Sequence, residues 1–107
     1  MLKLIRGQDC LTAAIVGEID HHTARRIREE TDAVLQQDLP HELILDFRGV
    51  TFMDSSGIGL IMGRYRLISQ WGGLVTIAGA PERIERILKI SGIEKLARIH
   101  SLKEEEV

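Results

Sequence analysis

Two adjacent serines follow an aspartate in the segment Asp54-Ser55-Ser56-Gly57, where a loop on the strand side is expected to become a helix. The start of a helix leaves several backbone N–H groups without partners and carries a partial positive charge of about half a unit. Asp54 or Ser55 could cap this helix, and a phosphate at the same place would also be well accommodated. The residue types therefore fit both an ordinary helix cap and a phosphorylation site.

Three glycines, Gly57, Gly59 and Gly63, fall in the first turns of the helix that should follow the serines. Together they cost this helix about 2–3 kcal/mol relative to alanine, so something must require their missing side chains. Close packing on a sheet is one such need, and a smooth face for a docking partner is the other, because Gly59 and Gly63 are one turn apart. The spacing matches neither a P-loop, which needs a following Gly-Lys-Ser/Thr, nor the dinucleotide fingerprint.

Catalysis by these serines would require further groups. A nucleophilic serine needs a base within hydrogen-bond reach and an oxyanion site, and Asp20 with His21 or His22 would be the candidates. The residues that precede Ser55 do not form the Gly-x-Ser-x-Gly elbow of the hydrolases. We expect no enzyme and no catalytic residue, and a serine hydrolase is the lesser alternative. A serine-directed phosphonate separates the two, because only a hydrolase would be labelled.

Other reactive side chains are given structural interpretations. The pair His21-His22 could ligate a metal, but no nearby cysteine or spaced acid completes a set of ligands, so neither metal nor cofactor is expected. Cys10 lies between apolar neighbours and is interpreted as a small buried hydrophobic residue. Trp71 fits an interface anchor or helix-end packing equally well. Acids in the first predicted helix neutralise its arginines and favour a solvated face: Glu29, Glu30 and Asp32 against Arg25, Arg26 and Arg28.

The composition is that of one globular domain over residues 1–107, with 44% hydrophobic residues. A formal charge of -2, from 14 basic and 16 acidic residues, predicts no general attraction to nucleic acid or membrane. A single cysteine cannot form an internal disulfide, which suits a reducing compartment. No apolar run approaches the roughly 20 residues of a membrane span, and no signal peptide is evident. We expect a cytoplasmic protein.

Hydrophobic periodicity predicts strands that alternate with helices. Strands are expected at 1–5 and 10–16 as an antiparallel hairpin, then at 43–47, 74–78 and 97–100, and 43–47 should be central or covered on both faces. Helices should run from an Asp20 cap to before Pro40, from Asp54 or Ser55 to about Gln70, and from Pro81 at the first helical position to Gly92. Such alternation implies parallel pairing. The predicted fold is α/β: a mixed sheet, mostly parallel with an N-terminal hairpin, flanked by helices.

Three segments resemble, in order and spacing, the STAS domain of anti-sigma factor antagonists: 17–24 (Gly-Glu-Ile-Asp-His-His-Thr-Ala), 52–59 (Phe-Met-Asp-Ser-Ser-Gly-Ile-Gly) and 63–65 (Gly-Arg-Tyr). The resemblance covers nearly the whole chain. It implies a single STAS domain whose partner is both anti-sigma factor and serine kinase, with its bound nucleotide. It also implies that Ser55, the first serine after the aspartate, is phosphorylated and that a serine phosphatase reverses this. The short amino terminus, Trp71 and the tail from Lys103 to Val107 depart from the pattern.

The function implied by the resemblance is that of an anti-sigma factor antagonist. The unphosphorylated form binds the kinase and releases the sporulation sigma factor, and phosphorylation of Ser55 prevents binding. The His21-His22 pair resembles the sporulation branch more than the general-stress branch, and the alternative is a general-stress or stressosome pathway. The residues expected to contact the partner are Asp20, His21, His22, Thr23, Asp54, Ser56, Gly57, Gly59, Met62 and Gly63.

Overall fold

A computed structural model describes residues 1–101 of the chain. The strands are β1 (Leu2–Gly7), β2 (Cys10–Ile19), β3 (Glu42–Met53), β4 (Leu74–Ala78) and β5 (Arg98–His100). The helices are α1 (His21–Asp38), α2 (Ser55–Ser69) and α3 (Glu82–Ser91), followed by the 3-10 turn η1 (Ile93–Lys95). The tail from Lys103 to Val107, expected to be a solvated end or an interaction tail, lies outside the described residues.

The five strands form one sheet in the order β1-β2-β3-β4-β5. β1 is antiparallel to β2, and every later strand is parallel to its neighbour. The spatial order follows the chain order because each helix returns the chain to the next parallel position. The predicted α/β fold, a mixed and mostly parallel sheet with an N-terminal hairpin, is confirmed. Within residues 1–101, no helix is long and apolar enough to cross a lipid bilayer.

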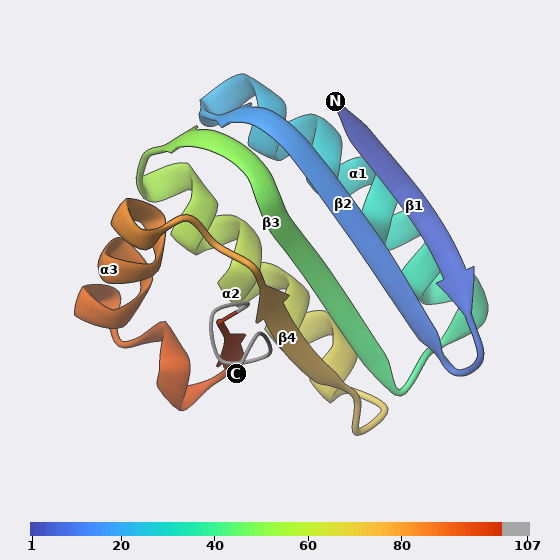
Figure 1. Ribbon diagram of the computed structural model, residues 1–107. Helices are drawn as coiled ribbons and strands as arrows, with labels where there is room; N and C mark the ends of the chain where they lie inside the picture. The colour runs from blue at the N-terminus through green and yellow to red at the C-terminus, as the bar shows by residue number, and fades with distance from the viewer. Residues whose placement is uncertain (102–107) are drawn as a thin grey trace.

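The core lies between the sheet and its helices. Helices α1 and α2 lie side by side behind the sheet in Figure 1, and α3 lies to the left of α2 in that view. The strand residues that face α1 and α2 are fully buried, whereas Ile44 and Asp46, on the opposite face of β3, are half-buried. β3 is therefore central but is not covered by helices on both faces. The buried strand residues are Leu11, Ala13, Ile15, Leu43, Leu45, Phe47, Val75 and Ile77.

Strand β2 is longer than the sequence predicts, and this extension positions the start of α1. The sequence predicts a strand that ends at Val16, but β2 continues to Ile19. Its register with β3 shifts twice near Gly17, whose φ of 106° lies in the left-handed region. A glycine adopts this φ without the steric cost that other residues would incur, so the strand bends and continues.

The helix boundaries agree closely with their capping residues. Asp20 caps α1, Leu39 follows it with a φ of 47°, and Pro40 comes next, so the chain leaves the helix there. Pro81 is the cap of α3 and not its first helical residue, because its ψ of 150° is extended. Gly92 ends α3 with a φ of 80°, as the sequence predicts.

Candidate docking site at the helix starts

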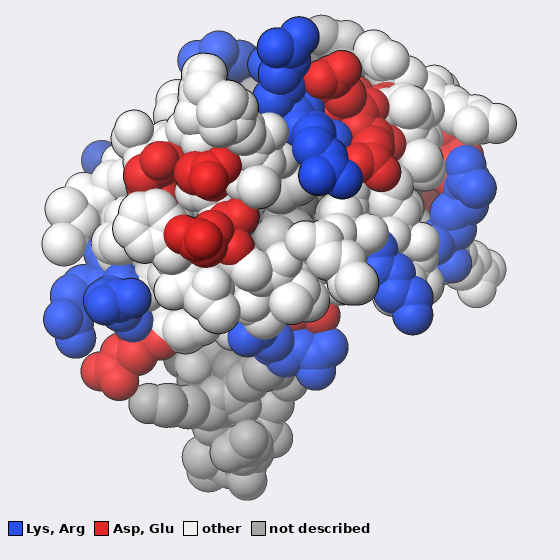
Figure 2. Space-filling view, turned by 90° about the horizontal axis from the view of Figure 1, so that it is seen from above, with Lys and Arg blue, Asp and Glu red and all other residues white. Residues whose placement is uncertain are grey.

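The starts of α1 and α2 lie together at one end of the sheet. β2 and β3 deliver them as parallel neighbours, and the backbone N–H of Asp54 donates to the carbonyl of Ile19 at 3.2 Å. Ile19 immediately precedes Asp20, the cap of α1, and Asp54 is the cap of α2. The bond therefore links the starts of the two helices. Segments far apart in the sequence, 17–24 and 52–59, are thus brought to one surface. Figure 2 looks onto this end, where uncharged atoms cover much of the surface and charges of both signs are scattered.

Asp54, and not Ser55, caps α2. Its carboxylate accepts a hydrogen bond from the backbone N–H of Ser56 at 2.8 Å, and its carbonyl accepts one from Gly57 at 3.0 Å. Ser55 is the first helical residue and is exposed, whereas Ser56 is half-buried. Within residues 1–101, the Asp54 carboxylate makes no hydrogen bond to the Ser55 hydroxyl. Ser55 therefore presents a free hydroxyl at a capped helix start.

The start of α1 is fixed by a reciprocal capping arrangement. One carboxylate oxygen of Asp20 accepts from the backbone N–H groups of His22 at 3.0 Å and Thr23 at 2.9 Å. In return, the Thr23 hydroxyl accepts from the Asp20 N–H at 2.8 Å. The hydrogen bond from the Thr23 N–H is the main reason that the pKa of Asp20 lies below its usual value. Desolvation opposes this effect. Asp20 and Thr23 therefore hold the helix start, which leaves the histidines to face solvent.

His21 and His22 are both exposed, with ring centroids 5.7 Å apart in an edge-to-face arrangement. Among residues 1–101, no group of three His, Cys, Asp or Glu side chains could hold a metal ion. The Asp20 carboxylate is committed to backbone N–H groups, and no hydrogen bond within residues 1–101 joins either histidine to Ser55 or Ser56. The residues that a serine hydrolase would need are near one another but are not arranged as a triad.

The three glycines of α2 do not share one face, so Gly57, which was expected to contact the partner, is not on the same surface as Gly59 and Gly63. Gly57 is buried, and a side chain there would overlap that of Met53. Gly59 and Gly63 instead have open space where a Cβ would lie. Each of the two explanations of the glycines holds for different residues. Gly57 is needed for close packing of α2 on β3, and Gly59 with Gly63 leaves a smooth accessible stripe. Met62 is half-buried against the core.

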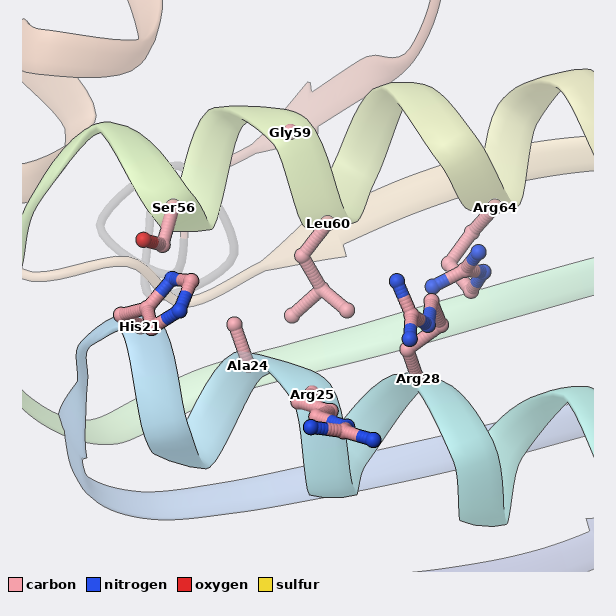
Figure 3. Close-up of a pocket in the computed structure, with 8 residues that line it drawn as sticks. All are labelled: His21, Ala24, Arg25, Arg28, Ser56, Gly59, Leu60 and Arg64. Carbon is pink, nitrogen blue, oxygen red and sulfur yellow. The ribbon is translucent and has the colours of Figure 1, made fainter.

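A groove of about 460 Å³ runs between α1 and α2 from this end of the molecule. Figure 3 shows Ser56 and His21 at one end of the groove and Arg28 and Arg64 at the other, with Ala24 and Leu60 between the helices. This groove could not be predicted from the sequence. The spacing of Arg25 and Arg28 places both on one face of α1, but their meeting with Arg64 of α2 depends on helix packing.

Arg64 is the buried charge of the groove, and its residue is only 5% exposed. Its Nε lies 2.8 Å from the Oδ1 of Asp32 on α1. The N–H is not aimed at that oxygen, so the contact is an ion pair without a directed hydrogen bond. Burial lowers the pKa of Arg64 and raises that of Asp32, in each case against the attraction of the partner.

The chain is similar to a known family along almost all of its length. The profile of the STAS domain matches residues 3–105. An anti-sigma F factor antagonist of Paenibacillus polymyxa is 37% identical over 99 residues, which are 92% of this chain and 85% of that protein. An anti-sigma-B factor antagonist of Staphylococcus epidermidis is 29% identical over 99 residues, 92% of this chain and 91% of that protein.

Solved structures show the same similarity. The anti-sigma factor antagonist SpoIIAA in its unphosphorylated form has a TM-score of 0.83 and 25% identity, covering 97% of this chain and 91% of its own. The phosphorylated form of SpoIIAA from Bacillus has a TM-score of 0.75 at 25% identity, covering 97% and 95%. The fold described above is therefore that of SpoIIAA in both states.

Proposed function

The chain belongs to the STAS domain family, and on that premise we propose that it is an anti-sigma factor antagonist controlled by phosphorylation of Ser55. The observation that carries the proposal is the exposed Ser55 hydroxyl, which lies directly after the Asp54 cap at the start of α2. The protein acts by binding. The nucleotide, the catalytic base and the phosphoryl transfer belong to a partner that is both anti-sigma factor and serine kinase, and a serine phosphatase restores the active form.

The sporulation pathway is the proposed setting. One relative that acts on an anti-sigma F factor is 37% identical, whereas a second such relative and one that acts on an anti-sigma-B factor are each 29% identical. The His21-His22 pair supports the same choice. In this setting the unphosphorylated protein binds the anti-sigma factor and releases the sporulation sigma factor. Because the proposed partners are an anti-sigma factor and a sigma factor, we expect this action in the cytoplasm.

The proposed docking surface comprises the two helix starts and the exposed stripe of α2. His21 and His22 extend from α1, Ser55 lies at the start of α2, and Gly59 and Gly63 continue along it. The Asp54–Ile19 backbone bond keeps the two helix starts together. Asp20, Thr23 and Asp54 contribute by holding the backbone, and Gly57 contributes by packing.

The proposed switch depends on unequal electrostatic costs in the free and bound states. A phosphate on Ser55 adds about -1.5 to -2 charges at a helix start, where negative charge is tolerated or mildly favoured. In a docked complex the same group would be desolvated without a full partner. A buried and uncompensated charge costs about 3–5 kcal/mol, which is roughly two to three and a half decades in affinity. The domain therefore need not refold in order to release its partner.

Isothermal titration tests the assignment to a pathway. The purified unphosphorylated protein is titrated into ADP-loaded anti-sigma factors, one from the sporulation pathway and one from the general-stress pathway of the same organism. We expect saturable binding to the sporulation protein and at least about tenfold weaker binding to the other, a difference of about 1.4 kcal/mol. Preference for the general-stress protein would overturn the pathway, and binding to neither would overturn the antagonist function.

A further inference from the structure

We propose that the groove between α1 and α2 binds the phosphate group of a small phosphorylated ligand. The groove measures about 460 Å³, within the roughly 300–1,000 Å³ of small-molecule sites. Its charged lining residues are Arg25 and Arg28 of α1 and Arg64 of α2, and His21 and Ser56 lie at one end (Figure 3). The side chains of Asp and Glu do not line it within residues 1–101. This site is distinct from the phosphorylation of Ser55 and does not depend on it.

Arg64 carries the inference furthest, because its guanidinium is buried without being fully satisfied. The side chain is 6% exposed, and its Nη1 makes no hydrogen bond within residues 1–101. A buried donor without a partner destabilises the folded state, and more so when it is charged. The ion pair with Asp32 compensates the charge but leaves that donor free. Because Nη1 itself has almost no accessible surface, an oxyanion in the groove would meet the part of the Arg64 guanidinium that lines it and would balance the buried charge.

The two arginines of α1 add charge that the protein itself compensates weakly. Arg28 forms no salt bridge within residues 1–101, although its charge attracts Asp32, and it contributes to lowering the pKa of Arg64, after burial. Arg25 pairs with Glu29 at 3.3 Å, but both side chains are exposed, at 74% and 61%, so this pair contributes little and a ligand can displace it. Like charges are thus held together at the groove, an arrangement that a bound anion stabilises.

Arg25, Arg26 and Arg28 are exposed, as expected for a solvated face, but they lie on two sides of α1. Arg25 and Arg28 line the groove toward α2, whereas Arg26 lines a different hollow with Glu18 and Glu30. The acids are shared between the two sides of the helix, since Glu29 pairs with Arg25 and Glu30 lines the hollow with Arg26. Arg26 provides a control with the same charge on the same helix.

Phosphate is the ligand chemistry that fits these donors best. Guanidinium groups are planar forks that bind phosphate oxygens in pairs, and three of them at one groove suit a divalent anion more than a single carboxylate. The groove is larger than a phosphate alone, and the Ser56 hydroxyl and the exposed His21 ring at its open end can contact the remainder of a ligand. Free phosphate and a phosphate monoester share this chemistry.

NMR titration of the unphosphorylated protein at constant ionic strength tests the proposal. Inorganic phosphate and glycerol 3-phosphate are the probes, and sodium chloride is the reference salt. We expect saturable amide shifts at Arg28, Ser56, Gly59 and Arg64 with both probes. At least threefold tighter binding of glycerol 3-phosphate would identify an organic phosphate as the ligand, and equal or tighter binding of inorganic phosphate would identify free phosphate.

The matched variants are Arg28→Glu and Arg26→Glu, which make the same charge change on the two sides of α1. Arg28→Glu should weaken binding at least tenfold, whereas Arg26→Glu should change it less than threefold. Arg64→Lys, which keeps the buried charge but removes the fork, should also weaken binding. Absence of saturable shifts with either probe would overturn the proposal, and so would equal weakening by the two glutamate variants.

Discussion

The guanidinium of Arg64 on α2 lies 2.8 Å from the carboxylate of Asp32 on α1, and this ion pair joins the two helices beside the groove that Arg64 lines. Asp32 is 26% exposed at its side chain, whereas Arg64 is 6% exposed. The pair therefore places a buried cation beside a partly solvated anion. Because the starts of the same two helices form the proposed docking site, the pair connects the stability of the domain to the geometry of that site.

Arg64→Ala should lower the free energy of unfolding by about 2–3 kcal/mol. Removal of one partner of a fully buried pair costs about 3–5 kcal/mol, and the partial exposure of Asp32 reduces that cost. Arg66→Ala, at an exposed position of the same helix, should change stability by less than about 0.5 kcal/mol. Urea unfolding of the three proteins measures the difference. Equal losses in the two variants would show that the ion pair contributes nothing beyond helix propensity.

Gly57→Ala and Gly59→Ala should change stability in opposite directions. A methyl group at Gly57 would overlap Met53, and overpacking of this kind costs about 1–3 kcal/mol. A methyl group at Gly59 meets open space, so the better helix propensity of alanine should raise stability by up to about 1 kcal/mol. Thermal unfolding of both variants checks the prediction. Destabilisation by Gly59→Ala comparable to that of Gly57→Ala would contradict the assignment of the two glycines to different faces.

Asp46 and Arg48 should contribute a pH-dependent part of stability on the open face of the sheet. The side-chain hydrogen bonds from Arg48, the shortest at 2.8 Å, are the main reason that the pKa of Asp46 lies below its ordinary value. A lowered native pKa means that the stabilisation is fully present above about pH 3.8 and is lost as pH falls through the native pKa. The pair is partly solvated, so its contribution should stay below about 1 kcal/mol.

Urea unfolding of the wild type and Asp46→Asn at pH 6 and at pH 2.5 measures this contribution. The wild type should be the more stable at pH 6, and the difference should shrink at pH 2.5. A difference that grows as the pH falls would mean that the native pKa of Asp46 is raised instead.

Much of the fold follows from local sequence signals. Asp20 as a cap, Gly92 as a left-handed residue and the alternating strand pattern each depend on neighbours in the chain, and each is confirmed. The strand that continues past Gly17 was missed because a glycine with a left-handed φ resembles a strand end when only the sequence is read. The sequence of β3 also resembles that of a strand buried on both faces, because an apolar residue, Ile44, lies on its half-buried face.

The candidate site was only partly predictable for a related reason. The segment from Asp54 to Gly57 is contiguous, so its capping chemistry can be read directly. The side on which each glycine lies depends on the rotation of α2 against the sheet, which no local pattern specifies. The meeting of Arg28 with Arg64 similarly depends on the packing of two helices whose sequences give no sign of each other.

The exposed stripe of α2 should be part of the docking surface. Gly59→Leu places a bulky side chain in open space, so the domain should stay folded while affinity for the anti-sigma factor falls at least tenfold. Arg66→Leu adds a leucine at another exposed position of α2 and serves as the control. Titration calorimetry with the ADP-loaded partner, alongside thermal unfolding, separates binding from stability. If Gly59→Leu binds normally, the stripe lies outside the interface.

Phosphorylation by the cognate kinase with ATP, followed by peptide mass spectrometry and an affinity measurement, tests the central claim most directly. We predict one phosphate, on Ser55, and at least about a hundredfold weaker binding of the modified protein to the ADP-loaded kinase, equal to about 2.7 kcal/mol. Ser55→Ala should remain unmodified, whereas Ser56→Ala should be phosphorylated like the wild type. Full modification of Ser55→Ala, or unchanged affinity of the protein phosphorylated on Ser55, would contradict the account.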